Sequence, residues 1–249
     1  ETCIKNNLVL VSDDENLRKV TKEFGGKAIT LEQFLEGRYR EFKDTEIGKI
    51  PEDWDVVRIK DIAEVVSGFG FPVKYQGKSS GKYPFIKVSD MNRTEKYIDF
   101  AENYIDDEDI KALRVKIYPP NTIIFPKIGM ATYLNKYRIL STWGTFDNNI
   151  GGIIPKNIHY EFLYYYFVAK VDLKKLAGQT TAPSIRKSTL ESLKVPRLPL
   201  PEQKAIANIL SKVDKLIQVK KEKKKILERI KKGMMQKLLT GEIRIKVSE

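Results

Sequence analysis

Three prolines and a long amphipathic pattern near the C-terminal end constrain most strongly how this chain can fold. Pro196, Pro199 and Pro201 stand directly before a run in which apolar residues recur at helical spacing as far as Leu239. Pro201 suits the first turn of a helix, where its missing N–H loses no hydrogen bond, and Glu202 suits the positive helix start. The pattern predicts one helix from Pro201 to about Leu239, roughly 60 Å long at about 1.5 Å per residue.

Apolar side chains on this helix recur about every seven residues, which indicates a seam for a partner helix. So long an amphipathic helix cannot bury its stripe against a small domain alone. The expected dimer or subunit interface consists of Ile206, Ile209, Leu210, Val213, Leu216, Ile217, Leu227, Ile230, Met234 and Leu238. Lys220, Lys223 and Lys224 interrupt the seam, so either a second copy of the helix is offset, or acidic residues of another subunit face this segment. A solvated face explains the run KKEKKK at 220–225 better than a DNA contact does.

The net charge of +12 points to a polyanionic partner, most commonly nucleic acid. Residues 201–249 hold fourteen Lys and Arg against six Asp and Glu, so this segment carries +8 of the total and the charge does not locate a ligand. No apolar run approaches the ~20 residues of a membrane-spanning helix, and no secretory signal is visible. The single cysteine, Cys3, can form no internal disulfide. We therefore expect a cytoplasmic protein without a membrane partner.

The chain divides into three expected parts. Residues 1–42 alternate apolar and charged runs that predict strand, helix, strand and helix, the last over LEQFLEGRYREF at 31–42. Residues 44–199 hold short apolar runs rich in β-branched and aromatic residues, which predict strands in VVRI, YPFIKV, NTIIFPKI, NIGGIIP and LKVP. The run NIHYEFLYYYFVAKVDLKKLAG at 157–178 predicts one buried helix closed by a glycine cap at Gly178. Residues 200–249 form the helical region. The predicted fold class is α+β: a mixed β-sheet domain with a few helices, followed by a long C-terminal helix that forms a coiled coil.

Four motifs resemble successive landmarks of the specificity subunit of Type I restriction-modification systems. They are GKIPEDWDVVRIKDI at 48–62, YPFIKVSDM at 83–91, AGQTTAPSIRKSTLESLKVPRLPLPEQKAIANIL at 177–210 and KKGMMQKLLTGEIRI at 231–245. The resemblance implies that 44–199 is a target recognition domain that reads double-stranded DNA. It also implies that the helix from 200 is a spacer that binds the methyltransferase (modification) subunit and the restriction/translocase subunit.

GKIPEDW and LPLPEQ each occur once, whereas a complete specificity subunit has two recognition domains and two spacers. The chain therefore resembles a half subunit, which could pair with a copy of itself as a dimer or be a fragment of a longer gene. Symmetric pairing would predict inverted half-sites in the DNA. Pro196, Pro199 and Pro201 would then form a stiff exit from the recognition domain, which would fix the distance between two half-sites.

Polar, glycine-containing segments of the middle part are the candidate DNA contacts, because base readout needs side-chain donors and acceptors flanked by phosphate-binding cations. The candidates are Lys74, Tyr75, Gln76, Lys78, Lys82, Asn92, Arg93, Asn135, Lys136, Tyr137, Arg138, Arg186 and Lys187. The alternative is that any solvated loop of a basic protein carries lysines. For Arg186 and Lys187, a turn shaped by Thr180, Thr181 and Pro183 is the favoured interpretation.

Catalytic signals are scarce, and we expect a non-catalytic subunit with no metal and no cofactor of its own. His159 has no cysteine or second histidine with which to share a metal, so a structural histidine with satisfied hydrogen bonds is expected. S-adenosylmethionine, ATP and Mg²⁺ would act on the partner subunits. Two alternatives remain. One is a non-specific basic DNA-binding protein. The other is a metal-dependent nuclease using Asp13 and Asp14, because residues 1–36 resemble the closing strand-helix-strand unit of PIN domains.

Overall fold

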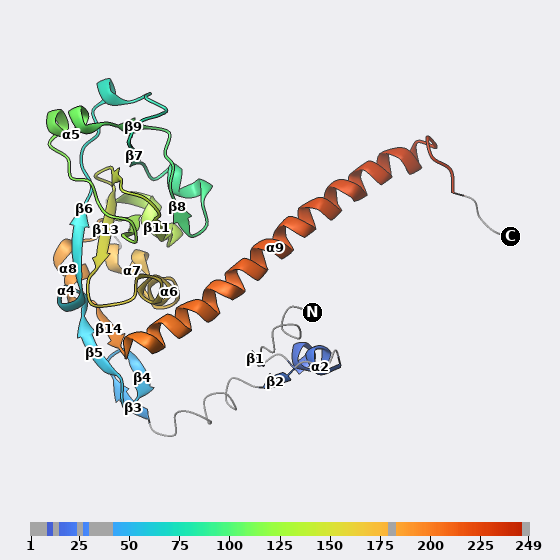
Figure 1. Ribbon diagram of the computed structural model, residues 1–249, viewed down its shortest axis with the longest axis horizontal. Coiled ribbons are helices and arrows are strands. Elements are labelled where there is room, and N and C mark those ends of the chain that lie inside the picture. Colours follow the sequence, from blue (N-terminus) through green and yellow to red (C-terminus); the bar gives the residue numbers. More distant parts are fainter. Residues whose placement is uncertain (1–8, 12–14, 24–26, 30–41, 179–182, 246–249) are drawn as a thin grey trace. The chain divides into compact units, whose positions relative to one another are not determined.

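The computed structural model of the chain describes residues 9–11, 15–23, 27–29, 42–178 and 183–245 (Figure 1). They form two compact units. Unit 1 is Glu1–Val57 with Lys194–Leu198, and unit 2 is Arg58–Leu193 with Pro199–Glu249. The three-part division expected from the sequence stays a prediction. No helix among the described residues is long and apolar enough to cross a membrane.

Unit 1 begins with the predicted strand, helix and strand. β1 (Val9–Val11) and β2 (Lys27–Ile29) pair in parallel, and α2 (Glu15–Glu23) connects them. Parallel neighbours need such a crossover, because a tight turn reverses the chain direction. The helix predicted at 31–42 lies outside the described residues except for Phe42, which begins a strand instead. Cys3, Asp13 and Asp14 also lie outside the described residues.

The rest of unit 1 consists of two strand pairs. β3 (Phe42–Thr45) and β4 (Gly48–Pro51) form an antiparallel hairpin, and the Thr45 hydroxyl donates to the Gly48 carbonyl at 2.6 Å. Gly48 has a φ of 105°, a conformation that side chains rarely adopt. β5 (Asp55–Arg58) pairs with β14 (Lys194–Arg197), which confirms the strands predicted at VVRI and LKVP.

A five-stranded sheet forms the centre of unit 2. Its order is β6 (Ala63–Ser67), β13 (Ile150–Pro155), β10 (Ile123–Pro126), β11 (Arg138–Leu140) and β8 (Tyr97–Ile98), and only the last pair is parallel. All four residues of β10 are buried, as expected for a central strand that is apolar on both faces. Gly152 of β13 lies so close to Phe146 and Val66 that a Cβ would approach them to 2.8 and 2.9 Å. Its lack of a side chain therefore lets the sheet pack closely.

A three-stranded sheet of β12 (Thr145–Phe146), β7 (Tyr83–Ile86) and β9 (Tyr104–Ile105) completes the core. Residues from both sheets pack together in one cluster that includes Ile86, Ile98, Ile124 and Phe146, all fully buried. Short helices connect the strands: α4 (Ile59–Ile62), η1 (Val73–Tyr75), η2 (Asp90–Arg93), α5 (Asp107–Leu113), η3 (Gly129–Leu134) and α8 (Lys187–Ser192). The buried sheets thus hold these connections in place, and several of them add buried residues of their own, such as Ile59 and Met91.

The single helix predicted at 157–178 is wrong, because the chain forms two helices there. α6 (Tyr160–Lys170) ends at Val171, and α7 (Leu173–Ala177) begins directly afterwards. Asp172 separates them, since its carboxylate accepts the N–H groups of Lys174 and Lys175 and caps the second helix. Gly178 ends α7 with a φ of 77°, as predicted for a glycine there.

The long C-terminal helix is confirmed as α9 (Leu200–Leu239). Pro199 is its N-cap, and the Pro199 carbonyl accepts the N–H groups of Glu202 and Gln203 at 3.0 and 3.1 Å. Ala207 is fully buried, whereas most side chains beyond Ser211 are exposed. The start of α9 therefore belongs to the core of unit 2, and the remainder leaves its apolar stripe uncovered by described residues.

Candidate nucleic-acid interface

Five of the candidate DNA contacts lie on the connection between β6 and β7, which contains η1. Lys74 is exposed, with its Nζ 5.0 Å from the centre of the Tyr75 ring. The Gln76 side chain is already hydrogen-bonded within the protein. Its amide N–H donates to the Phe71 carbonyl at 2.8 Å, and its side-chain carbonyl accepts from the Lys87 Nζ at 2.6 Å. Lys74 and Tyr75 therefore keep polar atoms for a ligand, and Gln76 shapes the loop.

Lys78 and Lys82 are held by the acidic start of α5. Lys78 pairs with Asp106 and lies 3.4 Å from Asp109, and the Lys82 Nζ lies 2.7 Å from Asp107. The hydrogen bond from Lys78 lowers the pKa of the Asp106 carboxyl, and the bond to Asp107 raises the pKa of Lys82 to about 12. Both lysines and the carboxylates of Asp106 and Asp107 are exposed, so a phosphate could displace these carboxylates at small cost.

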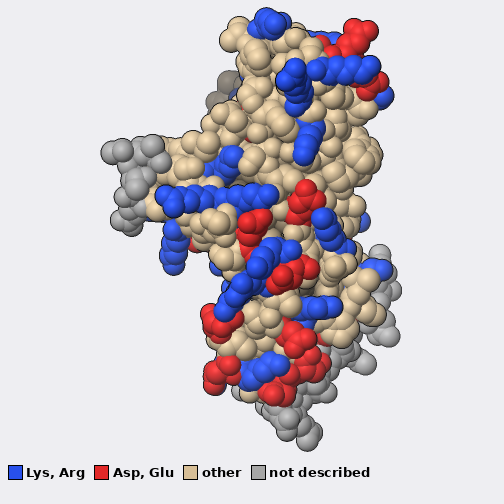
Figure 2. Space-filling view, turned by 90° about the vertical axis from the view of Figure 1, so that its left-hand side faces the viewer, with Lys and Arg blue, Asp and Glu red and all other residues tan. Residues whose placement is uncertain are grey.

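Asn92 and Lys136 come together although they are 44 residues apart in the sequence. The Lys136 Nζ donates to the Asn92 side-chain carbonyl, and Arg93 pairs with Glu102 on the exposed surface. On the face shown in Figure 2, basic and acidic side chains lie side by side in several places, and the described residues form no continuous basic surface there. A ligand on the face drawn in Figure 2 would therefore meet mixed charges and no broad positive field.

The expectation that Tyr137 and Arg138 contact DNA is corrected by their burial. Tyr137 is 1% exposed, and its hydroxyl donates to the Val171 carbonyl at 2.9 Å. Arg138 is 8% exposed and donates to the Thr94 hydroxyl at 3.1 Å and to the Tyr137 carbonyl at 2.6 Å. Burial raises the pKa of Tyr137 and lowers that of Arg138. Both side chains pack in the core and leave too little surface for contact with a base.

Asn135 has a structural role as well. Its φ of 50° lies in the left-handed region that asparagine tolerates, where it ends η3. Its side-chain carbonyl accepts the N–H of Leu173 at 2.8 Å, at the start of α7. Asn135 therefore joins two helices, and its capacity to contact a base is reduced.

Arg186 and Lys187 lie at the start of α8, with both side chains exposed. Arg186 is the N-cap residue, and the Lys187 Nζ lies 3.6 Å from Glu191 one turn later. Thr180 and Thr181, which were expected to shape the preceding turn, lie outside the described residues, whereas Pro183 is buried. These two cations remain candidate phosphate contacts.

His159 does not fit the expectation of a satisfied structural histidine. Its Nδ1 is buried and has no hydrogen-bond partner among the described residues. Burial lowers the pKa of the imidazole, with a smaller opposing effect from Glu161. Within the described ranges, no three His, Cys, Asp or Glu side chains are grouped so as to hold a metal ion.

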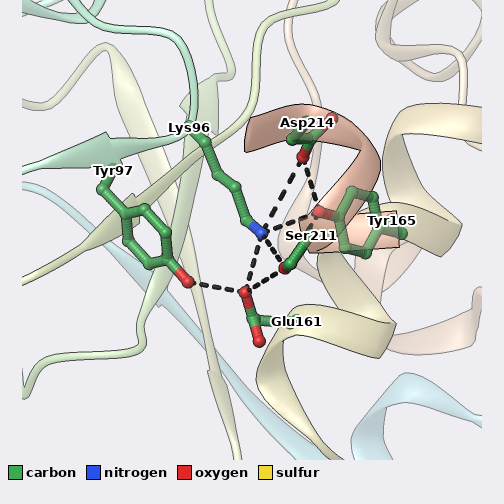
Figure 3. Close-up of polar contacts among 6 residues, drawn as sticks. All are labelled: Lys96, Tyr97, Glu161, Tyr165, Ser211 and Asp214. Atoms are coloured by element: carbon green, nitrogen blue, oxygen red, sulfur yellow. Dashed lines mark hydrogen bonds and ion pairs between the residues drawn. The ribbon is translucent and has the colours of Figure 1, made fainter. Parts of the chain in front are cut away.

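One cluster of polar side chains was missed by the sequence reasoning. We call it the joint cluster; it consists of Lys96 and Tyr97 at β8, Glu161 and Tyr165 on α6, and Ser211 and Asp214 on α9 (Figure 3). The Lys96 Nζ donates to Glu161 at 2.7 Å and to the Tyr165 and Ser211 hydroxyls at 2.8 Å each. The hydroxyls of Tyr97 and Ser211 also donate to Glu161, at 2.7 and 2.8 Å. Hydrogen bonds centred on Lys96 thus link β8, α6 and α9.

The joint cluster stabilises the ionised form of Glu161. Burial alone would raise the pKa of this carboxyl, but hydrogen bonds from Lys96, Tyr97 and Ser211 outweigh burial and lower it. Burial also raises the pKa of Tyr165, aided by its hydrogen bond to Asp214 at 2.5 Å. A groove of about 930 Å³ runs beside the cluster between η2 and α9. The only hint in the sequence was Glu161 itself, an acidic residue at the start of an otherwise apolar helix.

The predicted interface residues on α9 lie mostly on the surface. Ile206 and Leu238 are half-buried, and the other eight are exposed. Leu227, Ile230, Met234 and Leu238 line a shallow apolar groove along the second half of the helix. Nothing in the described part of the chain covers this groove, so its pairing partner stays a prediction.

Comparison with known proteins identifies relatives of this architecture. The family profile described as the Type I restriction modification DNA specificity domain matches residues 51–229. The MjaIX specificity subunit of Methanocaldococcus jannaschii, a Type I restriction enzyme subunit, is 37% identical over 195 residues, which are 76% of this chain and 44% of the relative. The MjaVIII specificity subunit of the same organism is 30% identical over 241 residues, which are 93% of this chain and 55% of the relative.

A solved structure shares the fold. The crystal structure of the HsdS subunit from Thermoanaerobacter tengcongensis superposes with a TM-score of 0.56 at 15% sequence identity, covering 89% of this chain and 52% of that subunit. The chain therefore spans about half the length of the relatives it matches.

Proposed function

This chain belongs to the family of Type I restriction-modification DNA specificity subunits, and we propose that it reads one half of a two-part DNA target. The observation that carries the proposal is the joint cluster. A domain with exposed polar loops is tied by partly buried hydrogen bonds to a long helix whose apolar stripe is uncovered by described residues. Such a molecule can hold a reading surface at a fixed place on a spacer.

The reading surface would comprise the exposed members of the candidate set. Lys74, Asn92 and Arg186 are exposed and Tyr75 and Lys136 are half-buried, on connections that the two sheets hold in place. Asparagine and tyrosine can present donors and acceptors to base edges, and the cations suit phosphates. Lys78, Lys82 and Arg93 would contribute after exchanging a carboxylate for a phosphate.

The stripe on α9 would hold the rest of the complex. Leu227, Ile230 and Met234 suit the seam of a helix pair. The partner helix would belong to a second recognition domain, in another copy of the chain or in a longer subunit. The modification and restriction subunits would bind the same helical region, in which Lys220, Lys223 and Lys224 offer a positive docking site. Catalysis would then belong to those subunits, which would use S-adenosylmethionine, ATP and Mg²⁺.

The test is sequence-selective binding by the chain together with the modification subunit of its system. A duplex selected from a random-sequence library should bind more tightly than random competitor DNA. Lys74→Ala should weaken binding and reduce the slope of log affinity against log salt concentration by about one. Tyr137→Phe, at a buried position of the same domain, should leave DNA affinity unchanged.

Equal displacement of every probe by random DNA would contradict the proposal and favour a non-specific binder. Cleavage of labelled RNA or DNA by the purified chain with Mg²⁺ or Mn²⁺ would also contradict it, if Asp14→Asn abolished the cleavage.

A further inference from the structure

The joint cluster brings together residues that lie far apart in the sequence and near one another in space. Ser211 is 115 residues from Lys96, yet its hydroxyl lies 2.8 Å from the Lys96 Nζ. The side chains of Lys96 and Glu161 are 13% and 16% exposed, whereas those of the Lys221–Glu95 pair are 50% and 67% exposed. The Lys96 Nζ also lies 4.4 Å from the centre of the Tyr165 ring, a cation–π contact that adds to the hydrogen bonds.

The contacts of Lys96 restrict the orientation of α9 relative to α6 and β8. Three acceptors from two helices surround one ammonium group, which has three hydrogens to donate. Glu161 in turn accepts from Lys96, Tyr97 and Ser211, so rotation of α9 would break bonds on both sides of the ion pair. A partly buried network of this kind fixes one arrangement more strictly than apolar contact does.

Farther along α9, the described ion pair to the recognition fold is weak. Lys221 lies 2.7 Å from Glu95, but the two side chains are 50% and 67% exposed. An exposed pair contributes little and is screened by salt. The direction of the helix is therefore determined mainly at the joint cluster and at the buried Gln203 and Ala207 before it.

A small change of direction has a large effect at the far end of the helix. The part of α9 beyond Asp214 extends for roughly 37 Å, at about 1.5 Å per residue. A tilt of about 10° would displace its end by roughly 6 Å, close to two base-pair steps of about 3.4 Å. Angular precision at the joint therefore decides whether two half-sites are measured to the nearest base pair.

We propose that Lys96 is a positioning residue that fixes the direction of α9 and thereby the half-site spacing that the assembled protein accepts. The proposal rests on the proposed function for its DNA readout, but the direction of α9 can be measured without DNA. The Lys96 side chain makes polar contacts with Glu161, Tyr165, Ser211 and Asp214, none of which is a candidate DNA residue. Its loss should broaden the accepted spacing and leave the reading of each half-site intact.

The variant is Lys96→Met combined with Glu161→Gln. The pair keeps the shapes of both side chains and leaves no buried charge without a partner, so the fold is retained. Lys221→Met is the matched control, because it also removes a lysine paired across the recognition fold and α9, but at an exposed position. Circular dichroism and thermal melting would verify that both variants fold.

The first measurement is the distance distribution between two spin labels, attached to cysteines introduced by Ser141→Cys and Lys224→Cys. Cys3→Ser removes the native cysteine, and the labelled protein is diluted with unlabelled chain so that only distances within one chain are measured. The parent and Lys221→Met should give one narrow distance. The double variant should give a broader or displaced distribution. An unchanged narrow distribution in a folded double variant would overturn the positioning role, whatever the protein does with DNA.

The second measurement is binding by the assembled complex to the selected duplex and to versions with one to three base pairs added to or removed from its centre. The parent should prefer one spacing by about tenfold, since both domains engage together only when the geometry allows it. The double variant should bind neighbouring spacings within about threefold while its affinity for a single half-site stays unchanged. An unaltered spacing preference would overturn the proposal. A parent without any spacing preference would contradict the proposed function instead. The distances between the spin labels would still test whether Lys96 fixes the direction of α9.

Discussion

The side-chain carbonyl of Gln203 on α9 accepts a hydrogen bond from the backbone N–H of His159, at 2.7 Å. Gln203 is 2% exposed and His159 is half-buried, and this partly buried bond closes the N-terminal end of α6. The glutamine of the LPLPEQ motif therefore anchors the long helix to the sheet domain of unit 2.

Gln203→Leu should destabilise unit 2, because it leaves the partly buried N–H of His159 without its acceptor. We expect a loss of about 1–3 kcal/mol in the free energy of unfolding. Urea unfolding followed by circular dichroism would measure it. Lys204→Leu, the same replacement at the exposed neighbouring position, should change the free energy by less than about 0.5 kcal/mol. Equal losses in the two variants would contradict the role of this hydrogen bond.

The single histidine should make stability depend on pH. Burial lowers the pKa of His159 below its ordinary value of 6.5 in the folded state. The unfolded chain therefore binds the proton more readily, and the contribution of the neutral imidazole is present above pH 6.5 and lost as the pH falls through the lowered pKa. Thermal melting between pH 5 and pH 8 should show a rise in melting temperature that is smaller in His159→Asn. Parallel curves for the two proteins would contradict this prediction.

Gly68, directly after β6, should tolerate no side chain. A Cβ there would lie 1.9 Å from the Asp147 carbonyl oxygen, so the backbone of one segment must move. We expect Gly68→Ala to cost about 1–3 kcal/mol or more in the free energy of unfolding. Gly70→Ala is the control, because its Cβ would meet nothing within 4 Å. A control as destabilised as Gly68→Ala would show that flexibility of the loop, not space, is what glycine supplies.

A charge in the apolar groove of α9 should prevent helix pairing. Leu227→Asp with Ile230→Asp would place two carboxylates where the groove needs apolar contact. Light scattering or sedimentation should show a paired parent and a single-chain variant. Lys232→Asp, on the opposite side of the seven-residue repeat, should pair like the parent. A single-chain mass for the parent as well would contradict pairing between copies of this chain.

Sequence periodicity predicted the elements that local pattern determines. The apolar run at Ile123–Pro126 and the long helix were visible because burial on both faces and a helical stripe leave clear signatures. The break between α6 and α7 was missed because Asp172 stands in an apolar run, although a cap-forming residue in that place was a usable signal.

The candidate contacts were predicted less well, because exposure depends on the fold. Tyr137 and Arg138 look like residues of a polar loop, yet β11 begins at Arg138 and faces the core. Lys96 resembles any surface lysine, since its partners stand 65 to 115 residues later in the chain. Local composition carries no information about such partners, and only the folded chain brings them together.

The pairing of β5 with β14 has a consequence for the order in which the protein folds. These strands stand on either side of Ile59–Leu193 in the sequence, so β5 leaves the ribosome long before its partner exists. Closing so long a loop is slow, and until then β5 exposes an unpaired strand edge. Synthesis halted before Lys194 would thus leave a nascent chain with an unpaired strand edge that promotes aggregation. Binding of chaperones to the nascent chain should decrease once the strand at 194–197 has been translated.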